Sequence, residues 1–215
     1  MPKTIQLALT AILSVSMGFA GTTGDNPDPE GIDDLKKVKG GLFKQCLVQP
    51  DAVFSDYGKL ISYPARLRFN IQQARSARAG TGSMISTRQE PPVTISGADQ
   101  AEVARVIDEA IKLELGSSDA FSLVHEAGPA TLLLITSVQD IDLKSAPSSS
   151  GRSQPLLSRG TVQFDLIDSE TGVILARFGE RRKIRYTAEA DEPWADVSEW
   201  ARLAAADLLQ ELKRL

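Results

Sequence analysis

Two alternating apolar stretches flank a short polar segment near residue 170, and this arrangement constrains the fold more than any other feature. Alternation with a period of two predicts strands with one buried face. The polar segment "DSETG" between the stretches is short and contains turn-forming residues, so the sequence predicts a β-hairpin. The apolar residues that recur at alternate positions are Val162, Phe164, Leu166, Ile174, Ala176 and Phe178.

The same stretch holds two aspartates and a glutamate, which raises the alternative of a metal or acid–base site. With Leu166 placed opposite Ile174, all six apolar side chains share one face, and Asp168 can hydrogen-bond the backbone of the turn. Gly172 can adopt the positive φ that closes such a turn. Asp165 and Asp168 differ in parity, so they point to opposite faces, whereas metal ligands must converge. We therefore predict a turn at this position.

Two segments have the periodicity of amphipathic helices. The first is 96–116, where Ser96 followed by Asp99 resembles a capping box and Gly116 is a suitable stop. The second is 196–215, with a predicted capping box at Asp196 and Glu199. Trp200 lies on the apolar stripe of the second helix and is expected in the core.

Three further segments complete the expected organisation. Residues 59–69 alternate and predict one strand, in which Pro64 indicates an edge or a bulge. Residues 132–136, "LLLIT", are apolar on both sides of the chain and predict a central strand, with a buried helix as the alternative. Residues 145–160 are rich in Ser and Pro and predict a flexible loop. The segment 70–95 predicts a long loop, and loops of that length often serve a partner contact.

The predicted order of elements is β-α-β-β-β-β-α, counting a short strand near Phe121. Strands that are mostly joined by hairpins, together with two amphipathic helices, favour one arrangement. The predicted fold class is α+β, with an antiparallel-rich sheet and both helices packed on one face as a two-layer sandwich.

The N-terminus has the pattern of an export signal. In residues 1–20 one lysine precedes an apolar run and a small-x-small pattern, which predicts a cleaved signal peptide. A membrane anchor is the alternative, although the run is shorter than a bilayer requires. Residues 21–45 are expected to form a flexible segment, and 46–215 a single domain. Gly21 stands where a lipoprotein would carry cysteine, so we expect a soluble periplasmic protein, or alternatively a secreted one.

Charge and composition exclude some functions. The 215 residues carry a formal net charge of −4, which gives no indication of nucleic-acid binding. Cys46 is the only cysteine, so no intrachain disulfide can form. His125 is the only histidine, and it lacks a second histidine to complete a metal set. Neither the Cys46/His125 pair nor "AGTGSM" at 79–84 has the context of a nucleophile or a phosphate loop. We expect no enzyme activity, cofactor or metal.

Basic residues on predicted strands suggest a binding patch. "RRKIRY" at 181–186 and the polar face of 59–69 bring several cations to strands of one sheet. Such a patch suits an acidic envelope protein or an anionic lipid surface, whereas a solvated sheet face is the simpler interpretation. Trp194, which precedes the second helix, has ligand stacking as an alternative to a structural role. The candidate patch residues are Arg66, Arg68, Arg181, Arg182 and Arg185.

Several stretches resemble one family. "QPDAVFSDYGKLISYPARL", "ATLLLITSVQDIDL" and "GTVQFDLIDSETGVILARFGERR" are similar to motifs of the domain-of-unknown-function 3313 (DUF3313) family of predicted bacterial lipoproteins. The resemblance covers roughly residues 48–215 and implies an α+β protein of the Gram-negative envelope, with no catalytic residues. The expected function is binding another periplasmic or outer-membrane component. A small-ligand or lipid carrier is the alternative, and a hydrolase is less favoured.

Overall fold

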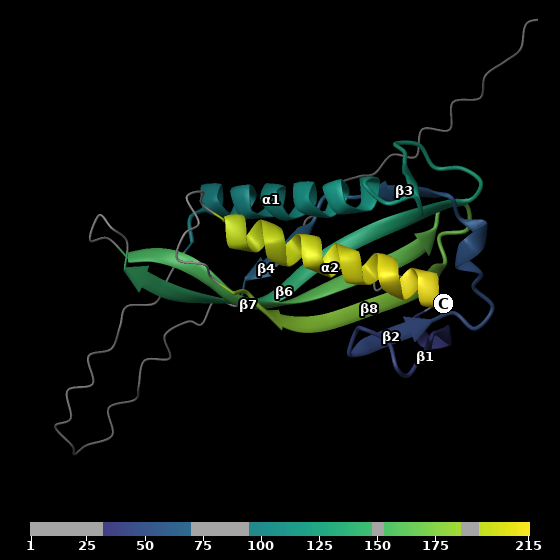
Figure 1. Ribbon diagram of the computed structural model, residues 1–215, viewed down its shortest axis with the longest axis horizontal. Helices are drawn as coiled ribbons and strands as arrows, with labels where there is room; N and C mark the ends of the chain where they lie inside the picture. Colours follow the sequence, from purple (N-terminus) through teal and green to yellow (C-terminus); the bar gives the residue numbers. More distant parts are fainter. Residues whose placement is uncertain (1–31, 70–94, 148–152, 186–193) are drawn as a thin grey trace, which may run out of the picture.

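The structure is a computed structural model that describes residues 32–69, 95–147, 153–185 and 194–215 (Figure 1). For residues 143–147 and 153–156 it describes the backbone alone. The predicted signal peptide, much of the predicted flexible segment 21–45 and nearly all of the loop 70–95 lie outside the described residues. The elements are η1 Ile32–Asp34, β1 Lys36–Lys37, β2 Gln45–Val48, η2 Phe54–Asp56, β3 Lys59–Ser62, β4 Arg66–Phe69, α1 Gly97–Gly116, β5 Ser122–Leu123, β6 Thr131–Pro147, β7 Ser153–Asp168, β8 Ile174–Lys183 and α2 Ala195–Arg214.

The strands form one mixed sheet in the order β1-β2-β8-β7-β6-β3-β5, with β4 also paired to β6. β3 pairs in parallel with β5 and β6, and β4 pairs in parallel with β6. The predicted antiparallel-rich sheet is therefore wrong. The chain is α+β with a single mixed sheet and two helices. The reason is topological: α1 intervenes between β4 and β6, and a helical crossover returns the chain in the same direction.

Both helices cover the same face of the sheet (Figure 1). α1 and α2 lie side by side and bury apolar stripes against the central strands. Phe164 of β7 and Phe178 of β8 are fully buried and pair with each other across the sheet. Trp200 of α2 is 6% exposed and belongs to this core, as predicted.

The two helices begin differently. Ser96 caps α1 by accepting a hydrogen bond from the Asp99 backbone N–H at 3.1 Å, which confirms the predicted N-cap. The capping box predicted for α2 is wrong, because α2 begins at Ala195 and its N-cap is Trp194, with no side-chain hydrogen bond. Trp194 has φ of 70°, a left-handed conformation that is uncommon for a bulky residue. It lies half-buried against the core.

The predicted hairpin is confirmed, but its register is wrong by two residues. Leu166 pairs with Ala176 rather than Ile174, and a bulge follows, with Ile167 opposite Ile174. A shift of two residues preserves the side on which each side chain lies, so the predicted buried face is retained through Leu166. Gly172 closes the turn with φ of 73°, and its N–H donates to the Asp168 carbonyl at 2.9 Å.

Pro64 divides the strand predicted at 59–69 into β3 and β4. Leu60 and Leu67 are seven positions apart, and in one regular strand an odd separation would place them on opposite sides. Both nevertheless contact the core, so the alternation shifts by one residue at the break. Ile61 therefore does not share the face of Leu67, contrary to the predicted pattern. Proline cannot donate to a ladder, which explains the interruption.

The loop predicted at 145–160 is mostly strand. β6 continues to Pro147 and β7 begins at Ser153. The paired ends of these two strands form a long arm that extends past the helices (Figure 1). At the other end of the chain, η1 and β1 fall within the segment expected to be flexible, and β1 pairs with β2. Neither described helix combines the length and hydropathy needed to cross a membrane.

Candidate binding face

The sheet has a second face, which carries neither helix. Residues paired across neighbouring strands point to the same side. Thr136, Phe164 and Phe178 are successive partners beneath the helices, so the alternate row of partners Ile135, Asp165 and Arg177 lies on the opposite side. We call this side the open face; its residues are Leu47, Ile61, Arg66, Leu133, Ile135, Ser137, Thr161, Gln163, Asp165, Ile167, Ile174, Arg177 and Arg181.

One end of the open face is apolar. Register places Ile61, Leu133, Ile167 and Ile174 in one row across four strands. Ile167 and Ile174 are buried, whereas Ile61 and Leu133 are half-buried. Among the described residues, this row does not belong to the core cluster beneath the helices. The apolar end also includes Leu47 and Ile135 of the next row, which are half-buried. Its accessible part therefore consists of Leu47, Ile61, Leu133 and Ile135, because Ile167 and Ile174 are already buried.

An ion pair occupies the middle of the open face. Arg177 Nε donates to Asp165 Oδ1 at 2.7 Å, and Arg177 Nη2 donates to Asp165 Oδ2 at 3.0 Å. Gln163 Nε2 also donates to Asp165 Oδ2, at 3.1 Å. Asp165 is only 6% exposed, and this bidentate geometry satisfies both of its oxygens. Asp165 and Asp168 lie on different sides of the strand, as predicted, and Asp165 has a structural partner of its own.

The other end of the open face is basic, and we define the basic end as Arg66, Arg68, Arg159, Arg181 and Lys183. Arg159 pairs with Lys183 in register, next to the Thr161–Arg181 pair. Arg68 alternates with core-facing neighbours on β4, so its exposed side chain points away from the helices. One carboxylate lies among these cations: Asp142 Oδ2 is 3.0 Å from Arg159 Nε and 3.1 Å from Arg181 Nη2.

The five arginines proposed from sequence do not all meet. Arg66, Arg68 and Arg181 share the open face, whereas Arg182 lies on the helix side. Arg182 Nη2 is 2.5 Å from Asp207 Oδ2 of α2, and its guanidinium carbon lies 5.4 Å from the Phe43 ring centroid. Arg185 is exposed just after β8. That these residues bind a partner stays a prediction.

Arg159 was missed because its segment was expected to be a loop. In a loop its side chain would have no defined face, whereas in β7 it stands opposite Lys183. The sequence gives little signal for this part of the strand, because no apolar residue occurs from Ser158 to Thr161, before the alternation that begins at Val162.

The turn aspartate is fully engaged in local hydrogen bonds. Asp168 Oδ1 accepts from the backbone N–H groups of Glu170 at 3.0 Å and Thr171 at 2.6 Å. Its Oδ2 accepts from the Tyr57 hydroxyl at 2.7 Å. Burial and this hydrogen bond raise the pKa of Tyr57 to about 12. Burial alone would raise the pKa of Asp168, but the hydrogen bonds from Thr171 and Tyr57 outweigh it and lower the pKa.

Cys46 forms part of a buried polar cluster that sequence reasoning did not find. Its thiol donates to Glu211 Oε1 of α2 at 3.8 Å. Burial, together with the Glu211 charge, raises the pKa of Cys46 to about 11. Glu211 is fully buried and also accepts from the Leu42 N–H at 2.6 Å and from Arg214. A hint exists in the sequence, because Glu211 follows Leu208 by three positions on the apolar stripe.

His125 lies exposed in the connection between β5 and β6, not in a strand as expected. Cys46 is on β2, at the opposite side of the sheet order from β5, and strands are spaced about 4.8 Å apart. β2 and β5 are thus roughly 24 Å apart across the sheet, so Cys46 and His125 cannot form a dyad. Across the described residues, no three His, Cys, Asp or Glu side chains gather in a metal-binding group.

Comparison with known proteins gives structural neighbours only. No family model and no curated protein matches the sequence. The PelC dodecamer chain from Paraburkholderia phytofirmans has 13% identity and a TM-score of 0.40, covering 78% of this chain and 94% of that one. A Xanthomonas campestris protein of the DUF330 family model has 13% identity and a TM-score of 0.36, covering 76% and 86%. A minor lipoprotein from Acinetobacter baumannii has 14% identity and a TM-score of 0.25, covering 73% and 90%.

These neighbours include a bacterial lipoprotein, but similarity of this extent assigns neither a family nor an activity to this chain. Membership of the DUF3313 family stays a prediction.

Proposed function

We propose that this protein is exported to the bacterial periplasm and binds another component of the envelope, without catalysis, through the open face of its sheet. The observation that carries the proposal is the chemistry of this face. It presents an apolar end and a basic end on strands that neither helix covers.

The two ends suit different steps of binding. The half-buried apolar side chains Leu47, Ile61, Leu133 and Ile135 release free energy when a partner removes them from water. Exposed cations steer an acidic partner during its approach. Between them, the Arg177–Asp165 ion pair fixes the side chains of two central strands, so the face is preorganised.

The absence of catalysis is part of the proposal, and it is supported by the state of the reactive groups. Cys46 has a pKa of about 11, so its thiol is protonated at neutral pH, whereas a nucleophilic cysteine acts as the thiolate. Asp168 uses both oxygens to hold the turn and Tyr57.

Site-specific photo-crosslinking in the periplasm tests the proposal. The full chain carries a photoreactive amino acid at Ser137 or Gln163 on the open face, or at Leu113 or Leu203 as matched controls on the helices. Leu113 and Leu203 are 72% and 47% exposed, so the controls are accessible. We expect one discrete adduct from the open-face positions and none from the helices. The proposal fails if the open face gives neither a protein adduct nor a lipid adduct, or if all four positions give the same one.

Export is tested separately. N-terminal sequencing of the protein recovered from the periplasm should begin at Gly21. An intact Met1, or recovery only from the cytoplasm, contradicts the predicted signal peptide.

The carrier alternative finds no support in the helix–sheet interface, because large side chains from both layers meet there. Phe164, Phe178 and Trp200 are at most 6% exposed, and Phe43 packs edge-to-face on Phe164 with ring centroids 6.0 Å apart. Native mass spectrometry distinguishes the two functions, since a carrier should retain a small ligand of defined mass after purification.

A further inference from the structure

We infer that the basic end of the open face docks on an anionic membrane surface, with the arginines contacting lipid phosphate groups. The inference rests on the proposed function and specifies the envelope component that is bound.

The first argument is the local charge. The basic end has five cations, and Arg185 lies exposed just beyond it. Among the described residues, the acidic side chains near these cations include Asp142, shared by Arg159 and Arg181, and the exposed Asp140, two positions before it on β6. A local positive excess on a chain whose formal net charge is −4 indicates a surface that attracts anions against the overall field of the protein. Clusters of four to eight Lys and Arg are typical of binding to anionic lipid.

The second argument is how the cations are spread. β4 and β8 are separated by β6 and β7, which places Arg66 roughly 14 Å from the β8 cations across the sheet. Ser137, Thr161 and Gln163 occupy the positions between them. Charges distributed in this way over a sheet surface fit an array of many phosphates better than one compact anion. The guanidinium group also binds phosphate oxygens in bidentate geometry.

The third argument is a neighbouring aromatic side chain. Tyr63 follows Ile61 by two positions and is 45% exposed. Tyrosine has an apolar ring and a polar tip, so it is favoured at the boundary between water and lipid. Tyr63 lies three residues before Arg66, in the break between β3 and β4, where it can enter the headgroup region beside the cations.

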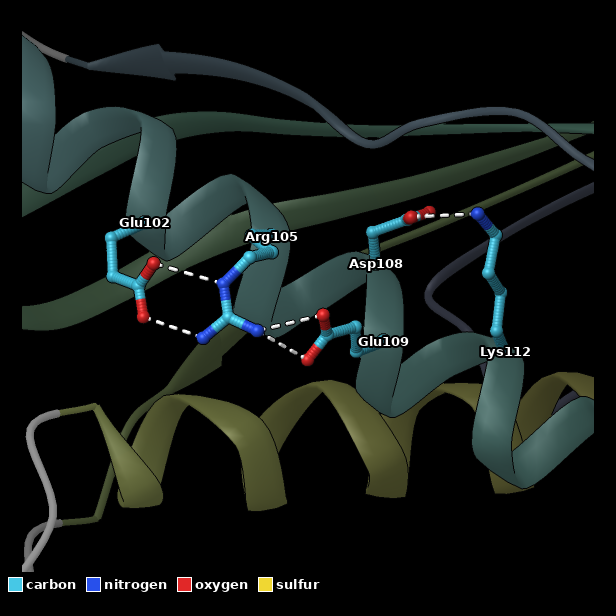
Figure 2. A network of polar contacts seen from close by, with 5 residues as sticks. All are labelled: Glu102, Arg105, Asp108, Glu109 and Lys112. Carbon is cyan, nitrogen blue, oxygen red and sulfur yellow. Dashed lines mark hydrogen bonds and ion pairs between the residues drawn. The ribbon is translucent and has the colours of Figure 1, made fainter.

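The helix side of the molecule has cations of a different kind. Figure 2 shows Arg105 of α1 held between Glu102 and Glu109, and Lys112 joined to Asp108. These pairs at i,i+3 and i,i+4 neutralise the charge locally. The helices therefore supply matched control positions with the same residue types and no comparable positive excess.

The test is sedimentation of the mature full-length protein with vesicles of phosphatidylglycerol and phosphatidylethanolamine, compared with neutral phosphatidylcholine vesicles. The test variant combines Arg66→Gln, Arg68→Gln and Arg181→Gln. The control variant combines Arg105→Gln, Lys112→Gln and Arg202→Gln, which changes the net charge equally; Arg202 of α2 is paired with Glu114 and Glu199. Circular dichroism confirms that both variants are folded.

We expect the wild-type protein and the control to bind anionic vesicles and not neutral ones, with binding weakened by added salt. Each cation near an anionic surface strengthens binding about fivefold, so the test variant should bind about a hundredfold more weakly. The inference is overturned if the wild type does not bind anionic vesicles at low salt, or if the control loses as much binding as the test variant. A protein adduct from the open face in the crosslinking experiment, without vesicle binding, overturns this inference and leaves the proposed function standing.

Discussion

Replacing Glu211 with glutamine tests whether its buried charge stabilises the fold. Glu211 is fully buried between α2 and the segment before β2, where it accepts hydrogen bonds from Leu42, Cys46 and Arg214. Gly41 allows the close approach of that segment, since a Cβ there would lie 2.9 Å from Glu211 Oε1. Glutamine keeps the shape and one acceptor oxygen but removes the charge.

The expected loss of stability follows because the hydrogen bonds to residue 211 no longer involve a charged acceptor. A hydrogen bond to a charged group contributes about 1.5–3 kcal/mol, against about 1 kcal/mol for a neutral pair. The bond from the Leu42 N–H becomes neutral in the variant, and Arg214 is partly exposed, so water solvates its guanidinium. We expect Glu211→Gln to lower the free energy of unfolding by about 1–2 kcal/mol at pH 7. For a chain of this size that lowers Tm by about 2–8 °C.

The effect should depend on pH in a defined direction. Burial would raise the pKa of Glu211, but hydrogen bonds from Arg214 and Leu42 outweigh it, so the folded-state pKa lies below the ordinary value of 4.5. A depressed folded-state pKa means that the charge contributes stability above the unfolded-state pKa, and that this contribution is lost as the pH falls through the folded-state value. The difference between wild type and variant should therefore be constant above about pH 5 and shrink below it.

Urea unfolding followed by tryptophan fluorescence measures this difference from pH 7 to pH 3. Trp200 is a suitable reporter because it is buried on the same helix. Glu109→Gln is the matched control, since the Glu109 side chain is 60% exposed and the substitution is the same. The reasoning is refuted if the variant is more stable than the wild type at pH 7, which would mean that burying the charge costs more than its hydrogen bonds return. A difference that stays unchanged down to pH 3 refutes the pH argument.

Three further substitutions test local features by thermal unfolding. Thr136→Val should stabilise the protein by about 1 kcal/mol, because the buried Thr136 hydroxyl has no hydrogen-bond partner among the described residues; a destabilised variant would contradict this. Asp168→Ala should destabilise it by about 2 kcal/mol, because the turn loses its acceptor for Thr171, and an unchanged Tm would show that Gly172 suffices. Tyr57→Phe should cost about 1–2 kcal/mol by leaving Asp168 with one donor fewer, and combining it with Asp168→Ala should be less than additive.

The sequence predicted features that depend on neighbours along the chain. Ser96 caps α1 because its side chain reaches an N–H three residues away, and Gly172 closes the turn because the backbone there needs a positive φ. The opposite sides of Asp165 and Asp168 follow from parity alone. Which residues of a strand share a side also depends only on their spacing along the chain. The buried face of β7 was therefore predicted correctly, although its register with β8 was not.

Tertiary structure decided what depends on partners distant in the sequence. The parallel pairing of β3 and β4 with β6 made the sheet mixed, and no short-range pattern carries that information. The same holds for the arm at 145–160, where strand pairing overrode a loop-like composition.

The candidate site shows this division most clearly. The sequence alone placed several cations on the polar sides of predicted strands, because successive side chains of a strand point to opposite faces. Parity alone separates Arg182 from Arg181, which the sequence prediction overlooked. Only the packed sheet brought Arg159 beside Lys183 and buried Glu211 beside β2. Which face is covered depends on where the helices pack, and that is settled by contacts between segments more than a hundred residues apart in the chain.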